Sequence, residues 1–254
     1  MPFRFCVAAL VTVPVLIAPA SGHATPPAAE PAVFVHVGVT LVPPVPRSRR
    51  QLNAMMQEVE AVWRPYGVAL LWLTPCARAS TSPPDVRLQV EFVGHARQKY
   101  PTRHPGPGVA RLGAIGFLEG GVPDDIVKLS ADEITAVMVP TLYGNGMESQ
   151  PQATIDDLVG RALGRVLAHE LGHYLLALPT HTQDGLMRAS FRGHDLAHRD
   201  RQAFRLDAFA FVRLQARLTE IRGMPEGNLR GGKPITFFNQ LHRNSTVVPE
   251  VRGR

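Results

Sequence analysis

The sequence IDDLVGRALGRVLAHELGHYLLAL, residues 155–178, carries the clearest structural pattern of this chain. Its hydrophobic residues fall almost all round a helix, which predicts that the helix is buried. Thr154 followed by Asp157 is a capping-box pattern at its start, and Pro179 would stop it. Small residues recur at every fourth position, at Gly160, Gly164, Ala168 and Gly172. Positions four apart share one face of a helix, so this face would let a neighbouring element approach closely.

Two histidines and a glutamate lie near the end of this helix. His169 and His173 are four residues apart, so both can offer an imidazole nitrogen to one zinc ion at about 2.0 to 2.1 Å. Glu170 is displaced around the helix, where a carboxylate can take a proton from an activated water without ligating the metal. The alternative is that these are ordinary polar residues. An unpartnered polar group on a buried helix costs several kcal/mol, which favours a zinc site.

A catalytic zinc takes three protein ligands and keeps one position open for water. His181 is the nearest candidate for the third ligand. The segment between the helix and His181 is long enough for the chain to reverse direction, and too short to carry His181 far from the end of the helix. His194, His198 and Asp184 are the other candidates. The two later histidines are otherwise read as surface residues near a helix start.

Strands are predicted before the long helix. Alternation of apolar residues predicts strands at 33–41 and 86–93, and shorter apolar runs predict strands at 68–74, 112–118 and 126–130. The nearly continuous apolar run at 68–74 is typical of a central buried strand. Gly113 and Gly116 favour an edge position or a bulge for the strand at 112–118.

Three further helices complete the prediction. Ser48 and Gln51 form a capping-box start for a helix that ends near Pro65, and this helix joins two strands as a parallel pair. A short helix after residue 131 is expected to end at Pro140, and a last amphipathic helix spans 198–218. The order predicts an α/β (α+β) fold with a twisted mixed sheet of four to five strands, a long helix, a turn and a C-terminal helix.

The first residues resemble a secretory signal peptide. Arg4 precedes an apolar run from Phe5 to about Ala18, and small residues surround Ala24. The run is shorter than the roughly 20 residues of a membrane span, so we expect cleavage near Ala24, no stable span afterwards, and a secreted or periplasmic protein. An uncleaved N-terminal anchor is the alternative. Residues 25–32 form a linker rich in Pro and Ala, and after cleavage Cys76 would be the only cysteine.

The net charge is +6, and the last residues carry much of the excess. Six Lys or Arg and two Glu occur in residues 222–254. We therefore expect a basic, flexible tail over 223–254. Nucleic-acid binding would need a basic face with aromatic or motif support, which this sequence does not show, so no nucleic-acid partner is predicted. The sequence does not indicate an oligomeric state.

The region around HELGH resembles the metzincin metalloproteases. Their pattern, HExxHxxGxxH followed by a Met-turn, is matched by His169, Glu170 and His173, by His181 with two extra residues, and by Met187 in DGLM. Leu176 stands where the family has glycine. The element order resembles the family over about residues 33–218. The resemblance also extends to small secreted bacterial proteins with a HELGHYLL core followed by GLMR, a largely uncharacterised group.

The resemblance implies a metzincin-like catalytic domain over 33–222, with zinc as cofactor and a peptide or protein as substrate. Glu170 would be the general base, His169, His173 and His181 the metal ligands, and Met187 a hydrophobic floor beneath the metal. The edge strand at 112–118 would pair with an extended peptide. The sequence thus predicts a secreted zinc metalloendopeptidase. The alternative is a weak or inactive relative that binds peptides or a surface partner, although such a protein need not retain Glu170.

Overall fold

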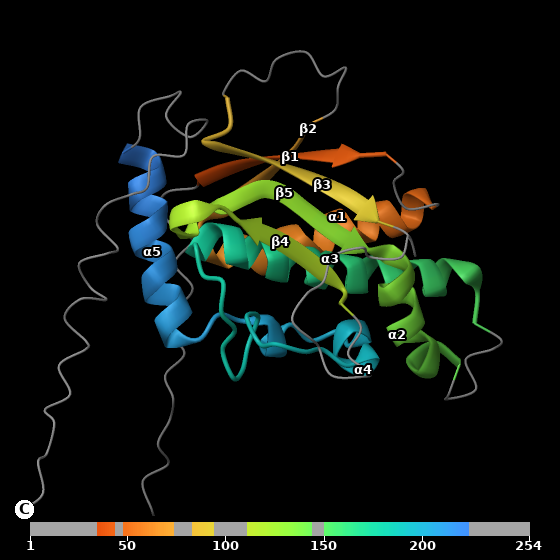
Figure 1. Cartoon of the computed structure of the whole chain (residues 1–254). Coiled ribbons are helices and arrows are strands. Elements are labelled where there is room, and N and C mark those ends of the chain that lie inside the picture. The colour runs from red at the N-terminus through yellow and green to blue at the C-terminus, as the bar shows by residue number, and fades with distance from the viewer. Residues whose placement is uncertain (1–34, 44–47, 74–82, 94–110, 144–149, 224–254) are drawn as a thin grey trace, which may run out of the picture.

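The computed structural model describes residues 35–43, 48–73, 83–93, 111–143 and 150–223. The predicted signal peptide, the linker, Cys76 and all but the first residue of the predicted tail lie outside these residues. Within them the chain folds into a five-stranded mixed sheet with helices on one face, which confirms the predicted α/β class (Figure 1).

The sheet has the strand order β2-β1-β3-β5-β4. Its strands are β1 (Val35–Val42), β2 (Val68–Leu73), β3 (Val86–Val93), β4 (Gly113–Phe117) and β5 (Pro123–Ser130). All neighbouring pairs are parallel except β4 and β5, which are antiparallel. The strand predicted at the edge, β4, does lie at one edge, as its glycines indicated.

The strand β2 lies at the opposite edge, so its prediction as a central strand was wrong. Its apolar run has another physical cause. Leu73 and Pro84 pack over Gly38 of β1, where an added β-carbon would lie 2.9 Å from the Cδ1 atom of Leu73. On α1, Glu60 accepts a hydrogen bond from the indole of Trp72 at 2.5 Å. Both faces of β2 are therefore partly covered, although it is the outermost strand of the described sheet.

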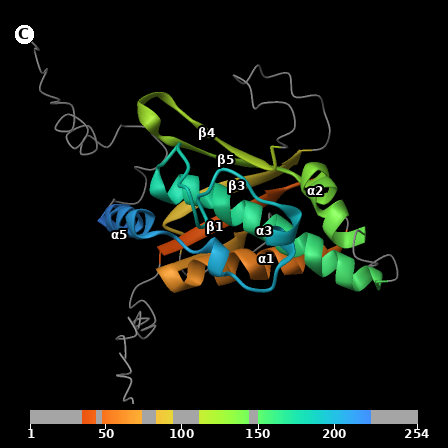
Figure 2. The same cartoon turned by 90° about the horizontal axis from the view of Figure 1, so that it is seen from below.

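Two helices lie side by side against the sheet (Figures 1 and 2). They are α1 (Arg49–Trp63) and α3 (Gln152–Leu176). The stripe of small residues on α3 makes their close approach possible. A β-carbon on Gly160 would lie 2.5 Å from the carbonyl oxygen of Gln51, and one on Gly164 would lie 2.7 Å from that of Met55. The core lies between this helix pair and the sheet.

The start of α3 differs from the prediction. The helix begins at Gln152 after Pro151, three residues earlier than predicted, and Thr154 lies inside it. Asp157 does not close a capping box, because its carboxylate binds Arg50 of α1 at 2.6 and 2.7 Å. Ser48 does cap α1, whereas Gln51 turns to Asp156 of α3 at 3.1 Å. Contacts between the helices thus replace the expected local ones.

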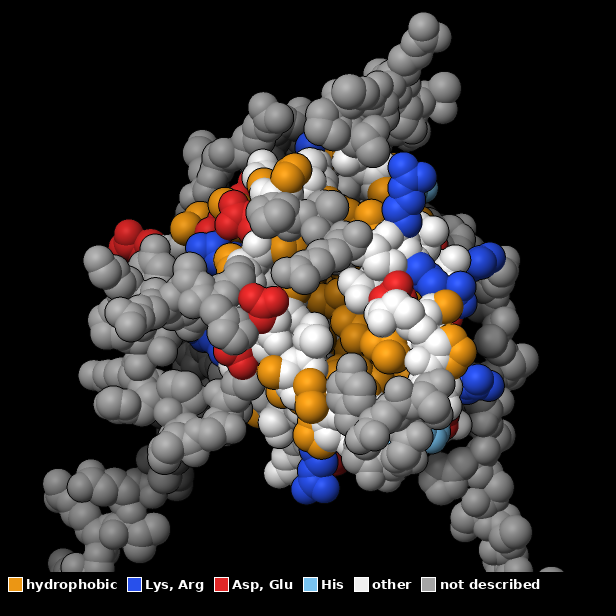
Figure 3. All heavy atoms as spheres, turned by 90° about the vertical axis from the view of Figure 1, so that its right-hand side faces the viewer, with side chains coloured by type: hydrophobic (Ala, Val, Ile, Leu, Met, Phe, Trp, Pro, Cys, Tyr) orange, Lys and Arg blue, Asp and Glu red, His pale blue; other side chains and the backbone are white. Residues whose placement is uncertain are grey.

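The helix α2 (Ala131–Tyr143) continues through Pro140, so the prediction that it ends there was wrong. Its buried side chains, Ile134, Met138 and Leu142, recur every four residues, and burial of Leu142 favours a further turn beyond the proline. Figure 3 shows the side of the molecule on which α2 lies, with hydrophobic side chains gathered near the middle of that face.

The last helix, predicted over 198–218, begins ten residues later in the structure, at Ala208. A short helix α4 (Gly193–Ala197) and a 3-10 turn (Gln202–Phe204) precede α5 (Ala208–Gly223). Further 3-10 turns lie at Arg64–Tyr66 and Glu119–Gly121. Arg165 of α3 donates to the carbonyl oxygen of Asp200, which a helix beginning at His198 would use internally, and also to that of Asp195 in α4. Among the described residues, no helix is both long and apolar enough to cross a membrane.

Candidate metal centre

The structure brings together three histidines at the end of α3. His169 and His173 are buried on the helix, and exposed His181 approaches from the chain that follows. One ring nitrogen from each lies within 4.8 Å of the others. The Nε2 atoms of His169 and His173 are 3.1 Å apart. Two imidazole nitrogens on a tetrahedral zinc lie about 3.3 Å apart, given Zn–N bonds of about 2.0 to 2.1 Å. The spacing fits such a metal.

Backbone carbonyls orient both helix histidines. The Nδ1 atom of His169 lies 2.7 Å from the carbonyl oxygen of Leu186, and that of His173 lies 2.5 Å from the carbonyl oxygen of Leu178. A carbonyl can only accept, so each Nδ1 carries the proton in a neutral ring. Both Nε2 atoms then present lone pairs toward each other. A cation between them would remove that repulsion.

Burial keeps these rings neutral. It lowers the pKa of His169 to about 3, although the hydrogen bond to Leu186 opposes the effect. Burial also lowers the pKa of His173 and of His181 from their ordinary values. Metal ligation requires an unprotonated nitrogen, so the three imidazoles are already in the protonation state that binds a divalent cation.

Glu170 is buried beside the edge strand β4. A β-carbon added to Gly113 would lie 2.6 Å from its Oε1 atom, so only glycine leaves room for this carboxyl group. Burial raises the pKa of Glu170 to about 8, and the charge of Arg111 partly opposes the shift. A cation held by the neighbouring histidines would favour the ionised form. A carboxyl group in this setting is suited to exchanging protons near neutral pH.

The chain leaves α3 through a left-handed residue that is not glycine. Ala177 has φ 45° and ψ 48°, and Leu178 donates its N–H to the carbonyl oxygen of His173 at 3.2 Å. Arg213 of α5 donates to the carbonyl oxygens of Leu176 and Ala177 at 2.5 and 2.8 Å. The turn thus falls one residue later than the metzincin glycine would place it. His181 likewise lies two residues later in the sequence than the third histidine of the metzincin pattern.

Met187 lies beneath the helix that carries the histidines. It is 1% exposed, and its Sδ atom occupies the space that a β-carbon on Gly172 would fill. The preceding turn is closed by a hydrogen bond of 2.9 Å from the N–H of Thr182 to the carbonyl oxygen of Met187. Gly172 therefore allows close contact with Met187 and the turn before it, residues 182–187, which we call the methionine turn. Gly160 and Gly164 allow close contact with α1.

The other candidate ligands lie elsewhere. His194 and His198 are exposed, and their rings lie 5.5 Å apart. Asp184 is exposed in the methionine turn. Within the described part of the chain, the only cluster of three His, Cys, Asp or Glu side chains able to hold one metal ion is His169, His173 and His181.

Several residues that shape the site are not identifiable from local sequence patterns. The carbonyl groups of Leu178 and Leu186 could not be found, because every residue carries the same group. The sequence does not reveal that Gly113 makes room for the carboxyl group of Glu170. Arg165 did leave a signal, since it is a charged residue within an apolar helical run. A charge in such a run indicates a buried partner. In the structure this partner is Glu58, whose Oε1 atom lies 2.8 Å from the Nε atom of Arg165.

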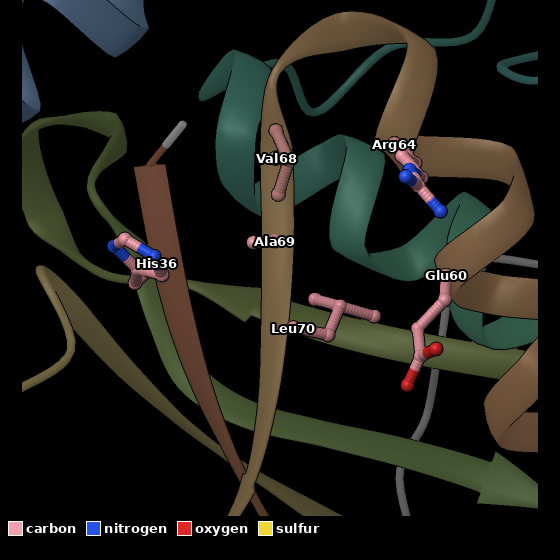
Figure 4. Close-up of a pocket in the computed structure, with 6 residues that line it drawn as sticks. All are labelled: His36, Glu60, Arg64, Val68, Ala69 and Leu70. Carbon is pink, nitrogen blue, oxygen red and sulfur yellow. The ribbon is translucent and has the colours of Figure 1, made fainter. Parts of the chain in front are cut away.

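A pocket of about 340 Å³ lies at the other edge of the sheet (Figure 4). It is lined by His36, Glu60, Arg64, Val68, Ala69 and Leu70. Glu60 is held by the indole of Trp72 at 2.5 Å. The pocket borders β2, whereas Glu170 lies beside β4, so the pocket is separate from the histidine cluster.

Comparisons with known proteins give a distant structural similarity. The chain is similar to the crystal structure of archaemetzincin from Methanopyrus kandleri, with 14% sequence identity and a TM-score of 0.40. The alignment covers 73% of this chain and 96% of that one. No family model matches the sequence, and no curated protein matches it.

Proposed function

We propose that this protein is a secreted zinc-dependent metalloendopeptidase. The observation that carries the proposal is the convergence of three neutral imidazoles beside a buried carboxyl group. His169, His173 and His181 present their nitrogens within 4.8 Å of one another, and Glu170 follows the first of them in the helix. Three nitrogen ligands with one open position are typical of catalytic zinc. Export rests on the signal-peptide pattern in residues 1–24.

The residues divide the chemistry among them. Zinc bound by the three histidines would supply Lewis acidity toward a water and a peptide carbonyl. Glu170 takes the proton from the attacking water and returns it to the leaving amine. The peptide bond is thereby hydrolysed, with one proton moved through one carboxyl group. Met187 contributes a hydrophobic floor and no proton transfer.

The open edge of β4, which pairs with no other strand among the described residues, supports a peptide substrate. Ser130 donates its N–H to the carbonyl oxygen of Leu112 at 2.9 Å, so the polar groups of Leu112 face β5. In an antiparallel pair this direction alternates, and the register therefore leaves Gly113 and Ile115 facing outward. An extended peptide could pair with these two residues. Gly113 also borders Glu170, which would bring the peptide backbone to the general base.

A peptide-binding protein without activity is the second candidate. The same open edge of β4 favours it, because strand pairing alone needs neither zinc nor a base. The two candidates differ in what they require of Glu170. A binding module needs no carboxyl group there, and burying one that has a pKa of about 8 serves no purpose in pairing.

Replacing Glu170 tests the enzymatic proposal. We expect the purified protein to contain about one zinc and to cleave an unfolded, fluorescently labelled protein. Glu170→Gln should keep the zinc and lower the cleavage rate by about 10²-fold or more, as expected for loss of a general base. Glu119→Gln, in the exposed turn after β4, is the matched control and should cleave at the wild-type rate. Unchanged cleavage by Glu170→Gln would contradict the proposal.

A further inference from the structure

A buried ion cluster links α1, α3 and the chain after the methionine turn. Arg165 is 0% exposed, Glu58 is 3% exposed, and the Nε atom of Arg165 lies 2.8 Å from Oε1 of Glu58. Arg201 donates to the other carboxylate oxygen of Glu58 at 2.7 and 3.1 Å. Burying charges in this way is costly, and hydrophobic residues of similar volume would often be no less stabilising. The cluster therefore calls for a reason beyond stability.

Arg165 holds the backbone between the short helix α4 and the 3-10 turn that precedes α5. Its Nη1 atom donates to the carbonyl oxygen of Asp195 at 2.5 Å, and its Nη2 atom donates to that of Asp200 at 3.1 Å. Its guanidinium also lies over the ring of Phe204, 4.3 Å from the centroid. Three of its nitrogens are thus engaged. Lysine could not reproduce this, because one ammonium group lacks the planar fork of donors.

Two chains of contacts lead from this segment to His169. In the first, the rings of Phe204 and Phe191 stack with their centroids 5.2 Å apart. The rings of Phe191 and His169 then meet nearly at right angles, with their centroids 5.4 Å apart. In the second, the carbonyl oxygen of Arg205 accepts a hydrogen bond of 2.8 Å from Leu186, whose own carbonyl accepts from His169 at 2.7 Å. Arg165 also precedes His169 by one turn on α3. The ring of His169 is therefore held from two sides.

We propose that Arg165 and Glu58 are positioning residues, which hold the segment 195–205 so that Leu186 and Phe191 orient His169 for metal binding. Neither residue touches the metal site itself. The proposal rests on the proposed function only in requiring that the histidines bind zinc. It concerns metal affinity and ring orientation, so it can be tested without a peptide substrate.

The test is the zinc affinity of Arg165→Lys, measured by competition with a chromophoric chelator. Loss of a group that orients a metal ligand typically weakens binding 10- to 100-fold, and we expect a loss in that range. In the metal-free protein, nitrogen NMR should show His169 changing its tautomer or populating both, while His173 keeps the proton on Nδ1. Arg201→Gln, which removes only the outer partner of Glu58, should give a smaller loss in the same direction.

Two controls separate positioning from general stability. Arg50→Lys alters the other arginine–carboxylate contact between α1 and α3, the pair with Asp157, and should leave zinc affinity unchanged. Val39→Ala, in the buried middle of β1, should lower stability without altering the tautomer of His169. If Arg165→Lys does not fold, Arg201→Gln carries the test, because the side chain of Arg201 is 48% exposed.

The outcomes distinguish the two proposals. Failure of the wild-type protein to bind zinc would overturn the proposed function and this inference with it. Tight zinc binding by the wild-type protein and by both variants alike, with the tautomer of His169 unchanged, would overturn the inference alone. A loss no greater than that in Val39→Ala at equal stability would also overturn it.

Discussion

The two halves of α3 treat their buried polar groups in opposite ways. In the first half, Asp156 accepts hydrogen bonds from Ser48, Gln51 and Gln152 at 2.7 to 3.1 Å. Burial raises the pKa of Asp156, but these bonds outweigh it and hold the pKa below the ordinary value. In the second half, burial dominates, raising the pKa of Glu170 to about 8 and lowering that of His169 to about 3.

The difference agrees with a separate role for each half under the proposed function. The polar groups of the first half are satisfied by the protein, and its glycines bring α1 into contact. The second half presents imidazole lone pairs and a carboxyl group whose pKa reflects burial and Arg111, with no hydrogen bond to that group among the described residues. Such groups are costly in a core unless they bind something. Under the proposed function, one helix therefore combines a structural half with a functional half.

The sharpest way to test this division is to remove one of the proposed zinc ligands. His181→Ala should weaken zinc binding by orders of magnitude, because one of three imidazole ligands is lost. The stability of the metal-free protein should change by less than about 0.5 kcal/mol, since His181 is exposed. Isothermal titration and thermal unfolding measure the two quantities.

His194→Ala provides the matched control for that experiment. His194 is also an exposed histidine, with 77% of its side chain accessible, and its replacement should leave zinc binding intact. The reverse result, with His194 essential and His181 dispensable, would place the metal elsewhere and break the comparison between the two halves of α3.

The sequence predicted local patterns well where packing agreed with them. The alternation in 86–93 became β3, and the small residues of 160–172 became the contact face of α3. The capping box at Thr154 failed because Arg50 of α1 captures the carboxylate of Asp157. Pro140 did not end α2 because Leu142 is buried beyond it. In both cases a contact distant in sequence outweighed a local preference.

The site was predictable in part for a similar reason. The spacing of His169 and His173 determines their shared face on a helix, and the structure brings His181 to them. The return of the chain through Ala177 depends on Arg213 of α5, which lies more than thirty residues away. Likewise, Glu58 and Arg165 are over one hundred residues apart, so no local pattern could connect them.

A smaller effect is expected in the structural half of α3. In Gly160→Ala, the new β-carbon would lie 2.5 Å from the backbone oxygen of Gln51, so α1 and α3 must move apart. Overpacking costs about 1 to 3 kcal/mol, and the better helix propensity of alanine returns about 1 kcal/mol. We expect a net loss of up to about 2 kcal/mol in denaturant titrations, with zinc affinity unchanged.

Gly223→Ala is the control for the glycine substitution. Gly223 ends α5, and a β-carbon there would meet no described atom within 4 Å outside its chain neighbours and its own helix backbone, so its replacement should not destabilise the protein. If Gly160→Ala weakened zinc binding as strongly as it weakened folding, the two halves of α3 would not be separable.

The smallest effect is expected at Ala177, where the structural and functional demands on α3 meet. A left-handed conformation costs a non-glycine residue about 1 to 2 kcal/mol, and glycine avoids that cost while losing about 0.5 to 1 kcal/mol through greater unfolded-state entropy. Ala177→Gly should therefore raise the free energy of unfolding by up to about 1 kcal/mol, measured in denaturant. Zinc affinity should stay the same, since the bonds from Arg213 reach backbone oxygens that glycine also carries. Weaker zinc binding in the more stable variant would instead show that the strained turn itself places His181, and strain would then join burial as a property of the functional half.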